Sequence, residues 1–326
     1  MNETGRIGNG YQVRGFGLCR PTSPSAKREG LAVARSAEAG ALTLRMPSPL
    51  LESARLSRRT LLQGLGVVAL GTVAGTAAHG FLYDRHHIEL TEQTLDVAGW
   101  PSSLAGLRIG FLTDLHRSTT VSHQMIAGAV DLVMAHQPDI IVVGGDYVTN
   151  RDHRFVQPAA EALAGLSAPF GVFAVLGNHD DERETSAALT DAGFVVLKDA
   201  RTQIDVRGEA VDIAGLRYWT HKMPEIARVV KGASPTLILV AHTPKRLIEA
   251  AALSVPLLLS GHTHGGQIVL PGIGAVAARE FPLIAGAGRR DNTTAFVSRG
   301  VGTVYVPVRV NCPPEVAILR IQPVSA

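Results

Sequence analysis

Short runs of apolar residues alternate with longer stretches of mixed residues along most of the chain from about residue 107. The short runs have the length of buried strands, and the longer stretches repeat apolar residues at helical spacing. This alternation predicts an α/β domain whose sheets are covered by helices. Few helices separate the last strands, which predicts a second sheet packed on the first. The expected strands are residues 108–113, 140–143, 172–176, 194–197, 211–214, 237–240, 257–259, 295–297 and 316–319, and the expected helices are residues 121–136, 158–166, 182–192, 224–230 and 244–252.

The first part of the chain follows a different pattern. Residues 1–45 are rich in Gly, Ser, Arg and Ala and show no sustained apolar period, which predicts disorder. We therefore expect residues 1–56 to form a disordered extension, with Met46 as an alternative start of the protein. Residues 57–80 are expected to form a signal or membrane anchor, and residues 81–326 the working domain.

The segment that precedes the domain resembles a twin-arginine export signal. It reads Ser57-Arg-Arg-Thr-Leu-Leu-Gln63 and continues without charge to Ala78. An uncleaved anchor is the alternative, because ~20 apolar residues span a bilayer. Arg55, Arg58 and Arg59 lie before this stretch, and the positive-inside rule then places the domain outside the cytoplasm. We expect a protein on the periplasmic side of the inner membrane, anchored or released, with the twin-arginine machinery as a partner. A cytoplasmic, membrane-associated protein is the alternative.

The charge distribution argues against nucleic acid as a partner. The isoelectric point is about 9.0, which would suit a basic binding surface. However, residues 1–78 carry 10 Lys and Arg against 4 Asp and Glu, whereas the other residues carry 21 against 24, a net charge of −3. The chain has 2 cysteines, Cys19 and Cys312, too few for a disulfide framework or a cysteine metal site. Any metal must be held by His, Asp, Glu or Asn.

Polar residues of a narrow set of types directly follow five of the predicted strands. Loops at the carboxyl ends of strands gather in one crevice in α/β sheets, so these residues are expected to meet. Each segment alone is also explained by a helix cap, a turn or a surface residue. Together, in this order, they favour a polynuclear metal site. The segments are Thr113-Asp-Leu-His116, Gly144-Gly-Asp146, Gly177-Asn-His-Asp180, Ala241-His-Thr-Pro244 and Gly261-His-Thr-His264.

These motifs, in this order, resemble the calcineurin-like metallophosphoesterase family from Leu107 to Ile321. The form Gly261-His-Thr-His-Gly-Gly-Gln267, followed by Pro307-Val-Arg309 and Cys312-Pro-Pro-Glu315, resembles a membrane-tethered or exported branch. Some members of that branch hydrolyse UDP-2,3-diacylglucosamine in lipid A synthesis. The resemblance implies a four-layer αββα sandwich of two mixed sheets flanked by helices. One departure is Leu216-Arg-Tyr-Trp219, where the branch often carries acidic residues.

The resemblance also implies a role for each matching residue. It implies two divalent metal ions, with Mn, Fe or Zn as candidates that suit mixed His, Asp and Asn ligands. His179 would be the leaving-group acid or transition-state stabiliser, and Asp180 would orient it. The first metal would be held by Asp114, His116, Asp146 and His264, and the second by Asp146, Asn178, His242 and His262.

The expected function is hydrolysis of a phosphodiester or pyrophosphate by a hydroxide that bridges the two metals. Export favours an envelope or lipid-linked phosphate ester as substrate. A UDP-2,3-diacylglucosamine pyrophosphatase is the alternative, although that substrate is made in the cytoplasm. A nuclease is disfavoured by the charge of the domain, and a non-catalytic binding module is disfavoured because every ligand position is filled.

Overall fold

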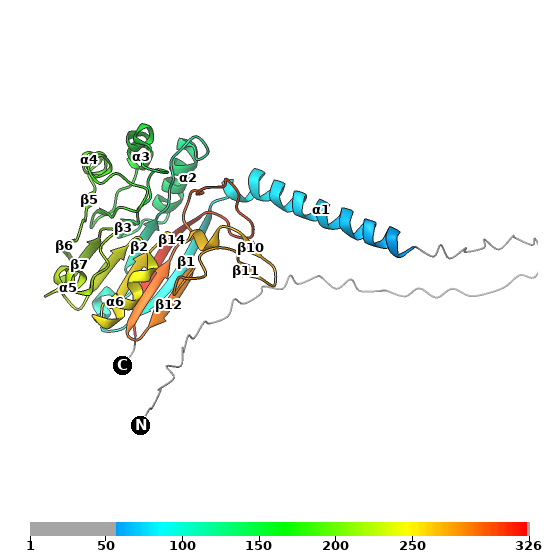
Figure 1. Cartoon of the computed structure of the whole chain (residues 1–326). Coiled ribbons are helices and arrows are strands. Elements are labelled where there is room, and N and C mark those ends of the chain that lie inside the picture. The colour runs from blue at the N-terminus through cyan, green and yellow to red at the C-terminus, as the bar shows by residue number, and fades with distance from the viewer. Residues whose placement is uncertain (1–56, 325–326) are drawn as a thin grey trace, which may run out of the picture. The chain divides into compact units, whose positions relative to one another are not determined.

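The structure, a computed structural model, describes residues 57–324 and contains two six-stranded mixed sheets and one two-stranded hairpin (Figure 1). Arg108–Leu112 (β2) lies near the middle of the first sheet, in the order β1-β14-β2-β3-β4-β5. β14 pairs antiparallel with β2, and the other neighbours in this sheet are parallel. The remaining strands of this sheet are β1 (Glu89–Val97), β14 (Glu315–Pro323), β3 (Ile140–Val143), β4 (Val172–Ala174) and β5 (Val195–Val196).

The second sheet has the order β12-β13-β9-β8-β7-β6. Its strands β13, β9, β8 and β7 are parallel, and the outermost pairs at both edges are antiparallel. The bounds are β12 (Gly286–Arg290), β13 (Thr293–Val297), β9 (Leu257–Ser260), β8 (Leu237–Ala241), β7 (Glu209–Leu216) and β6 (Ala200–Val206), with β10 (Val269–Leu270) and β11 (Gly274–Ala275) in the hairpin.

Helices cover the outer face of each sheet and an apolar layer fills the space between the sheets. Phe111 of β2 and Phe296 of β13 meet edge to face across that layer, and both are fully buried. The first sheet packs on one set of helices and the second sheet on another (Figure 1). The αββα sandwich is therefore confirmed. The first set is α2 (His123–Met134), α3 (Val156–Leu163) and α4 (Glu184–Asp191), and the second is α5 (Met223–Val230) and α6 (Leu247–Ala252).

The apolar segment before the domain forms one helix, α1 (Arg58–Leu82). The span of 29 residues from Arg58 to His86 contains an 18-residue stretch with a mean hydropathy of 1.6, so the helix is long and apolar enough to cross a membrane by length and composition. Gly80 is buried, and a methyl group there would overlap the Arg309 carbonyl oxygen. The expected disordered extension and the alternative start at Met46 lie outside the described residues.

The strand and helix predictions match the central elements and the edge strand β5, but they miss the other three edge strands. β1, β6 and β12 were not predicted, and all three carry many exposed positions. The prediction that the late strands form the second sheet is wrong for residues 316–319. They belong to β14, which lies in the first sheet between β1 and β2. Its long apolar run fits a central position, because both faces of β14 are buried at residues 315–319.

Candidate metal centre

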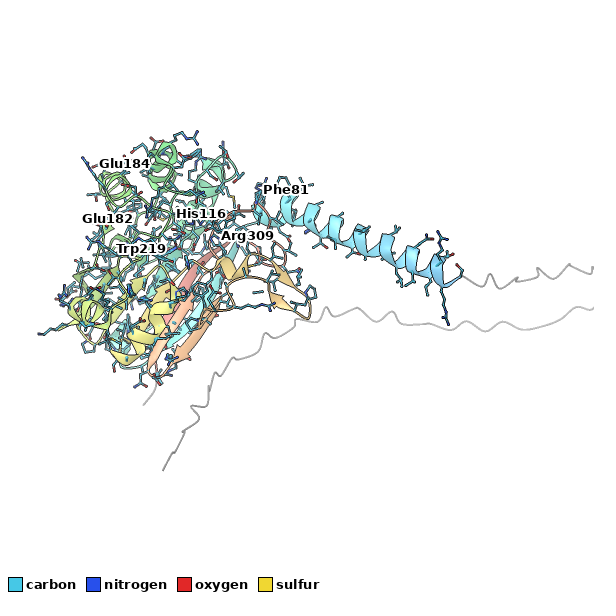
Figure 2. All side chains as sticks on the ribbon, viewed as in Figure 1. Phe81, His116, Glu182, Glu184, Trp219 and Arg309 are labelled. Carbon is cyan, nitrogen blue, oxygen red and sulfur yellow. The ribbon has the colours of Figure 1, made fainter. Side chains whose placement is uncertain are left out.

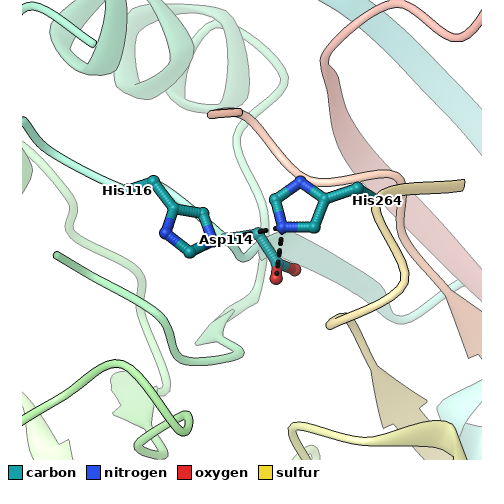
Figure 3. A group of neighbouring side chains, drawn as sticks. All are labelled: Asp114, His116 and His264. Atoms are coloured by element: carbon teal, nitrogen blue, oxygen red, sulfur yellow. Dashed lines mark hydrogen bonds and ion pairs between the residues drawn. The ribbon is translucent and has the colours of Figure 1, made fainter. Parts of the chain in front are cut away.

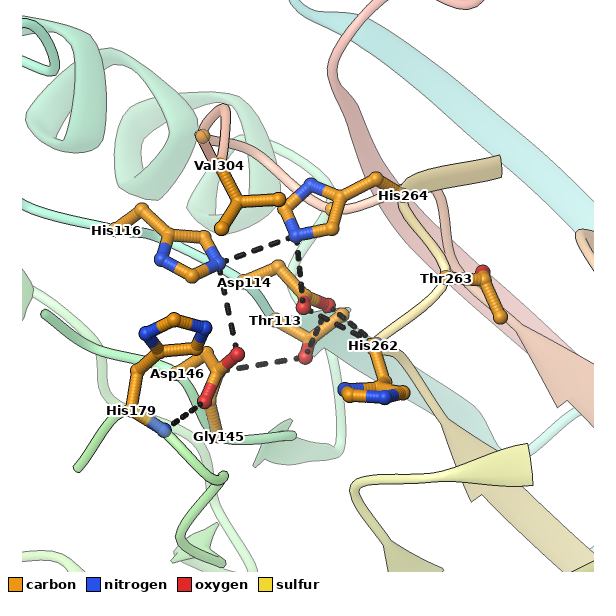
Figure 4. A network of polar contacts seen from close by, with 12 residues as sticks. Thr113, Asp114, His116, Gly145, Asp146, His179, His262, Thr263, His264 and Val304 are labelled. Atoms are coloured by element: carbon orange, nitrogen blue, oxygen red, sulfur yellow. Dashed lines mark hydrogen bonds and ion pairs between the residues drawn. The ribbon is translucent and has the colours of Figure 1, made fainter. Parts of the chain in front are cut away.

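The segments singled out in the sequence come together at the carboxyl ends of β2, β3, β4, β8 and β9 (Figure 4). Asp114 and His116 follow β2, and Asp146 follows β3. Because parallel strands end at the same edge of a sheet, their loops meet. Two groups of three potential metal-ligating side chains result, one of Asp114, His116 and His264 and one of Asp146, His242 and His262.

The first triad consists of Asp114, His116 and His264, all of them buried (Figure 3). The Nε2 atom of His264 lies 3.3 Å from Oδ1 of Asp114 and 3.1 Å from Nε2 of His116. Three ligand atoms within these distances form a compact coordination set. Imidazole and carboxylate together suit divalent ions such as Zn, Mn or Fe.

The second triad consists of Asp146, His242 and His262. The Nε2 atom of His242 lies 3.2 Å from Oδ2 of Asp146 and 3.2 Å from Nδ1 of His262. Asn178 follows β4, and its side-chain Oδ1 is buried without a hydrogen-bond partner among the described residues. A buried amide oxygen without a partner is costly unless a cation or a water fills the position. The donor set therefore fits a second divalent ion.

Asp146 lies between the two triads. Its Oδ2 atom is 3.2 Å from His242 Nε2 and 3.5 Å from His116 Nε2. Its Oδ1 atom accepts a hydrogen bond of 2.9 Å from the backbone N–H of His179. One carboxylate oxygen thus faces nitrogens of both triads while the other is fixed by the protein (Figure 4).

Burial makes three of the histidines neutral at physiological pH. It lowers the pKa of His116 to about 4 and that of His262 to about 3, and it lowers the pKa of His264 well below its usual value. Burial also raises the pKa of Asp114 to about 6. Neutral imidazole nitrogens and carboxylate oxygens then face one another at short range, an arrangement that a bound cation stabilises.

His242 behaves differently because it faces Asp146. Burial alone would lower the pKa of His242, but attraction to Asp146 and Asp114 and the contact with the Gly144 carbonyl together outweigh burial and raise the pKa to about 10. Burial raises the pKa of Asp146, but His242, His116 and His179 together lower it by more, so the net shift is downward. Without metal, this pair is therefore an ion pair. The proton that it holds must leave before His242 can bind a metal.

Four groups behind the candidate ligands were not identified from the sequence. Thr113 donates its hydroxyl to Asp114 Oδ2 at 2.8 Å, and the carbonyl oxygen of Gly144 lies 2.7 Å from His242 Nδ1. Thr149 Oγ1 lies 3.3 Å from His116 Nδ1, and a guanidinium nitrogen of the fully buried Arg309 lies 3.4 Å from His264 Nδ1 (Figure 2). The contacts of Thr113, Gly144 and Thr149 are of the kind that orients metal-binding side chains, whereas Arg309 lies beside the His264 ring as a neighbouring positive charge. Arg309 belongs to the motif Pro307-Val-Arg309 quoted above, but nothing in the sequence indicated that its side chain is buried.

The backbone at the centre adopts an uncommon conformation. Positive φ angles, which only glycine adopts without strain, cost roughly 1–3 kcal/mol at other residues and concentrate at functional sites. A side chain at Gly177 would overlap Asp146, and one at Gly261 would overlap Asp114, so the loops need both glycines. The candidate ligands with positive φ are Asp114 (53°), His116 (48°), Asp146 (56°), His262 (70°) and His264 (51°).

His179 and Asp180 lie beside the triads, but not in the expected relation to each other. The His179 ring accepts the Asn150 backbone N–H at Nδ1, 2.9 Å away. The carboxylate of Asp180 accepts backbone N–H groups instead, from Asp146, Tyr147 and Gly177, each at 2.8 Å. The prediction that Asp180 orients the His179 ring is therefore wrong. Asp180 fixes the loop that presents Asp146, because a buried carboxylate needs several donors.

Aromatic side chains border the centre on two sides. The ring centroid of Tyr218 lies 5.3 Å from that of His262, and Phe281 lies at the same distance from His262. On the other side, the ring of Tyr305 lies 6.0 Å from that of His179. Tyr218 belongs to the segment that departs from the acidic pattern of the branch. Aromatic rather than acidic groups therefore border the centre there.

Comparison with known proteins agrees with this geometry. The sequence profile of the family described as Calcineurin-like phosphoesterase matches residues 107–266. An uncharacterised metallophosphoesterase of Bacillus subtilis, YkuE, is 30% identical over 283 residues, which cover 82% of this chain and 98% of the relative. The phosphodiesterase YaeI of Escherichia coli is 29% identical over 276 residues, 82% of this chain and 99% of the relative.

A third relative comes from Danio rerio. Its name is transmembrane protein with metallophosphoesterase domain, and it is 28% identical over 265 residues, which cover 75% of this chain and 60% of the relative. The family profile, two bacterial relatives aligned over almost their full length and the two clusters of ligand atoms all agree. The chain therefore belongs to the calcineurin-like phosphoesterases and is a metal-dependent phosphoesterase.

Proposed function

We propose that the protein hydrolyses a phosphodiester or pyrophosphate bond with two divalent ions held by the triads. Asp114, His116 and His264 hold one ion and His242, His262 and Asn178 the other, with Asp146 shared. The position of Asp146 carries the proposal, because its Oδ2 lies 3.5 Å and 3.2 Å from nitrogens of the two triads. When bound, a pair of divalent ions lowers the pKa of a water molecule and neutralises charge on the phosphoryl group.

His179 is proposed to assist departure of the leaving group, as its acid or as a stabiliser of the transition state. Its Nδ1 accepts the Asn150 N–H, so the ring presents its Nε2–H to the leaving group as a hydrogen-bond donor. The ring of His179 lies 5.1 Å from that of His116, which brings it close to the first triad. A donor there assists departure of an alkoxide, which is a poor leaving group. Asp180 acts through the backbone around Asp146.

The substrate is proposed to be an envelope or lipid-linked phosphate ester. Support comes from the apolar helix before the domain, the twin-arginine pattern at Arg58 and Arg59, and a relative whose name calls it a transmembrane protein. These features favour a domain on the periplasmic side of the inner membrane, anchored or released by cleavage. A UDP-2,3-diacylglucosamine pyrophosphatase of lipid A synthesis is the alternative substrate assignment.

The proposal is tested by metal analysis combined with a substrate panel. The purified chain is reconstituted with Mn, Fe or Zn, and metal content is measured by mass spectrometry. Activity is then assayed with bis(p-nitrophenyl) phosphate, p-nitrophenyl phosphate, UDP-2,3-diacylglucosamine and duplex DNA. We expect about two metals per chain and hydrolysis of the diester faster than of the monoester.

Each other result points to a different function. Two bound metals without hydrolysis of any substrate would indicate a binding module. Cleavage restricted to UDP-2,3-diacylglucosamine would support the alternative, and DNA cleavage that falls steeply with salt would indicate a nuclease. A single bound metal with full diesterase activity would contradict the shared position of Asp146.

A further inference from the structure

Two uncharged segments next to the metal centre expose large apolar side chains. Residues 267–278 and residues 300–308 contain no Asp, Glu, Lys or Arg. Ile273 is 63% exposed and Val276 is 51% exposed in the first segment. Exposed apolar groups of this kind, gathered in segments without charge, are typical of surfaces that contact a partner or a membrane.

The second segment exposes its apolar residues at a turn. Tyr305 is 82% exposed and Val306 is 50% exposed. Tyr305 also has a φ angle of 60°, a conformation that costs an aromatic residue stability and persists only where the surroundings hold it. The backbone around Tyr305 therefore holds its large aromatic ring exposed to water. A ring of this kind gains free energy at a lipid interface, where tyrosine is enriched.

Hydrogen bonds join the two segments into one rigid unit. The buried side chain of Gln267 donates to the carbonyl of Val306 at 2.8 Å and accepts from the N–H of Val304 at 3.0 Å. The backbone N–H of Val269 donates to the carbonyl of Val310 at 2.9 Å. We call residues 267–278 and 300–308 together the apolar rim. Its exposed side chains are held in place rather than carried on a free loop.

The end of the candidate membrane helix packs on the apolar rim. Gly80, in the last turn of α1, lies against Val308, Arg309 and Val310 so closely that a side chain there would overlap them. The next residue along the chain, Phe81, is 39% exposed (Figure 2). The apolar rim is therefore continuous with the point where a helix of membrane-spanning length ends.

The metal centre borders the same surface. His264 of the first triad is followed within three residues by Gln267, where the apolar rim begins. Tyr305 of the rim lies 6.0 Å, ring to ring, from His179. A lipid bilayer in contact with the apolar rim would thus lie beside His179 and the first triad.

We infer that the apolar rim docks onto the surface of a lipid bilayer and presents the metal centre to phosphate esters held in that bilayer. The inference rests on the proposed membrane location and extends it, because it assigns the face of the domain that contacts the bilayer. A second copy of the chain is the other candidate occupant. The bilayer is favoured because the apolar helix ends on the rim itself.

The test places a fluorescent probe on single cysteines of the full chain. Cysteine replaces Ile273 or Val306 in the rim in a Cys19→Ser background, since Cys312 is buried, and each is labelled with a nitrobenzoxadiazole dye. The chain is reconstituted in vesicles of phosphatidylethanolamine and phosphatidylglycerol. Iodide quenches probes in water, and spin-labelled phospholipids quench probes in the bilayer. We expect iodide quenching at both rim positions at least about threefold weaker than at Ile248→Cys, together with quenching by the spin-labelled lipids.

Two controls separate failure of the inference from failure of the anchor. Ile248, 51% exposed on α6, reports the aqueous phase, and Leu70 of α1, 73% exposed, reports helix insertion. Lipid quenching at Leu70→Cys with full iodide quenching at the rim would overturn docking and retain the anchor. Absence of lipid quenching at Leu70→Cys would overturn both. Iodide protection at the rim without lipid quenching would indicate a second copy and overturn the inference.

Activity gives an independent readout of docking. Ile273→Asp and Val306→Asp place charge at exposed positions of the rim that touch no candidate ligand, so folding should be kept. We expect them to slow hydrolysis of a phosphodiester presented in vesicles about tenfold, because a charge is costly in an apolar interface. Hydrolysis of bis(p-nitrophenyl) phosphate should be unchanged. Equal rates for wild type and variants on both substrates would overturn the inference.

Discussion

Several candidate ligands are fixed from behind by a contact that leaves another polar atom facing the centre. His242 Nδ1 lies 2.7 Å from the Gly144 carbonyl, so Nε2 is left for a metal. The carboxylate of Asp114 accepts the backbone N–H of His262 at 2.9 Å. Such contacts set the tautomer and direction of a ligand before metal arrives. We conclude that the centre is preorganised.

Asp146→Asn removes the shared negative charge while keeping the size of the side chain. We expect metal content to fall below two per chain and diesterase activity to fall by at least about a thousandfold, because a neutral amide is a poor bridge between two cations. Metal is measured by mass spectrometry and activity with bis(p-nitrophenyl) phosphate. Asp291→Asn, in an exposed turn, is the matched control. Full metal content in Asp146→Asn would disprove the shared position.

His179→Gln tests the proposed proton donor. No metal ligand is removed, so metal content should stay that of the wild type. Turnover should fall about 10²–10⁴-fold, the usual contribution of a general acid, and most for substrates with poor leaving groups. The measurement is kcat for a series of aryl phosphodiesters. His153→Gln, at an exposed histidine that pairs with Glu184, serves as control. Loss of metal would instead show that His179 is a ligand.

Metal binding should release a proton from His242. Its pKa is raised to about 10 in the metal-free chain, so the ring is protonated at pH 8, whereas a metal ligand must be neutral. We expect about one proton to leave on binding at pH 8, and apparent affinity to rise with pH up to the raised pKa. Calorimetry in two buffers of different ionisation enthalpy measures the number. Equal binding enthalpies in both buffers would rule out the ion pair.

The elements that carry the centre were predictable, whereas three of the four edge strands were not. β3 is an unbroken apolar run buried at every position, and the polar residues after it stand out. β1 and β12 alternate exposed and partly buried residues, because an edge strand has neighbours on one side only. Such a pattern resembles that of a loop. The ends of the buried strands therefore predicted the candidate ligands, whereas the exposed edge strands carry too weak an apolar signal to be recognised.

The groups that surround the candidate ligands were also not predictable from the sequence. Arg309 donates hydrogen bonds to the carbonyls of Arg299, Gly300, Gly302 and Cys312. Nothing in the sequence around Arg309 indicates a buried guanidinium, since arginine is usually exposed. Its position depends on the carbonyl groups of the turn after β13, which surround the guanidinium only in the folded chain. The sequence predicts which residues can bind metal, and the fold determines what holds them.

Arg309→Met tests this element. The change leaves several buried carbonyl groups without donors, so we expect the free energy of unfolding to fall by about 3–5 kcal/mol. The segment from Arg299 to Gly302 should loosen, and retention of metal should fall because His264 loses a neighbour. Urea denaturation with and without metal measures both effects. Arg320→Met, exposed on β14, is the control, and equal stability of the two variants would contradict the assignment.

The whole molecule divides into a basic leader and a weakly acidic domain. The excess of basic residues lies in residues 1–78, and the rest of the chain has a net charge of −3. Positive charge before an apolar helix favours the cytoplasmic side, which is the basis for the proposed location of the domain outside the cytoplasm. The same charge distribution leaves the domain without a broad basic surface for nucleic acid. The distribution of charge along the chain therefore bears on two proposals at once, the location of the domain and the class of its substrate.

The side of the membrane that holds the domain decides between the two substrate assignments. An epitope tag after Ala326 is exposed to protease in spheroplasts only if the domain has been exported. We expect the tag to be digested without detergent, because Arg58 and Arg59 precede an apolar helix of spanning length. Arg58→Lys with Arg59→Lys keeps the charge but removes the twin-arginine pattern, so export by that route should stop and the tag should become protected. A protected tag in the wild-type chain would place the centre in the cytoplasm, where UDP-2,3-diacylglucosamine is made.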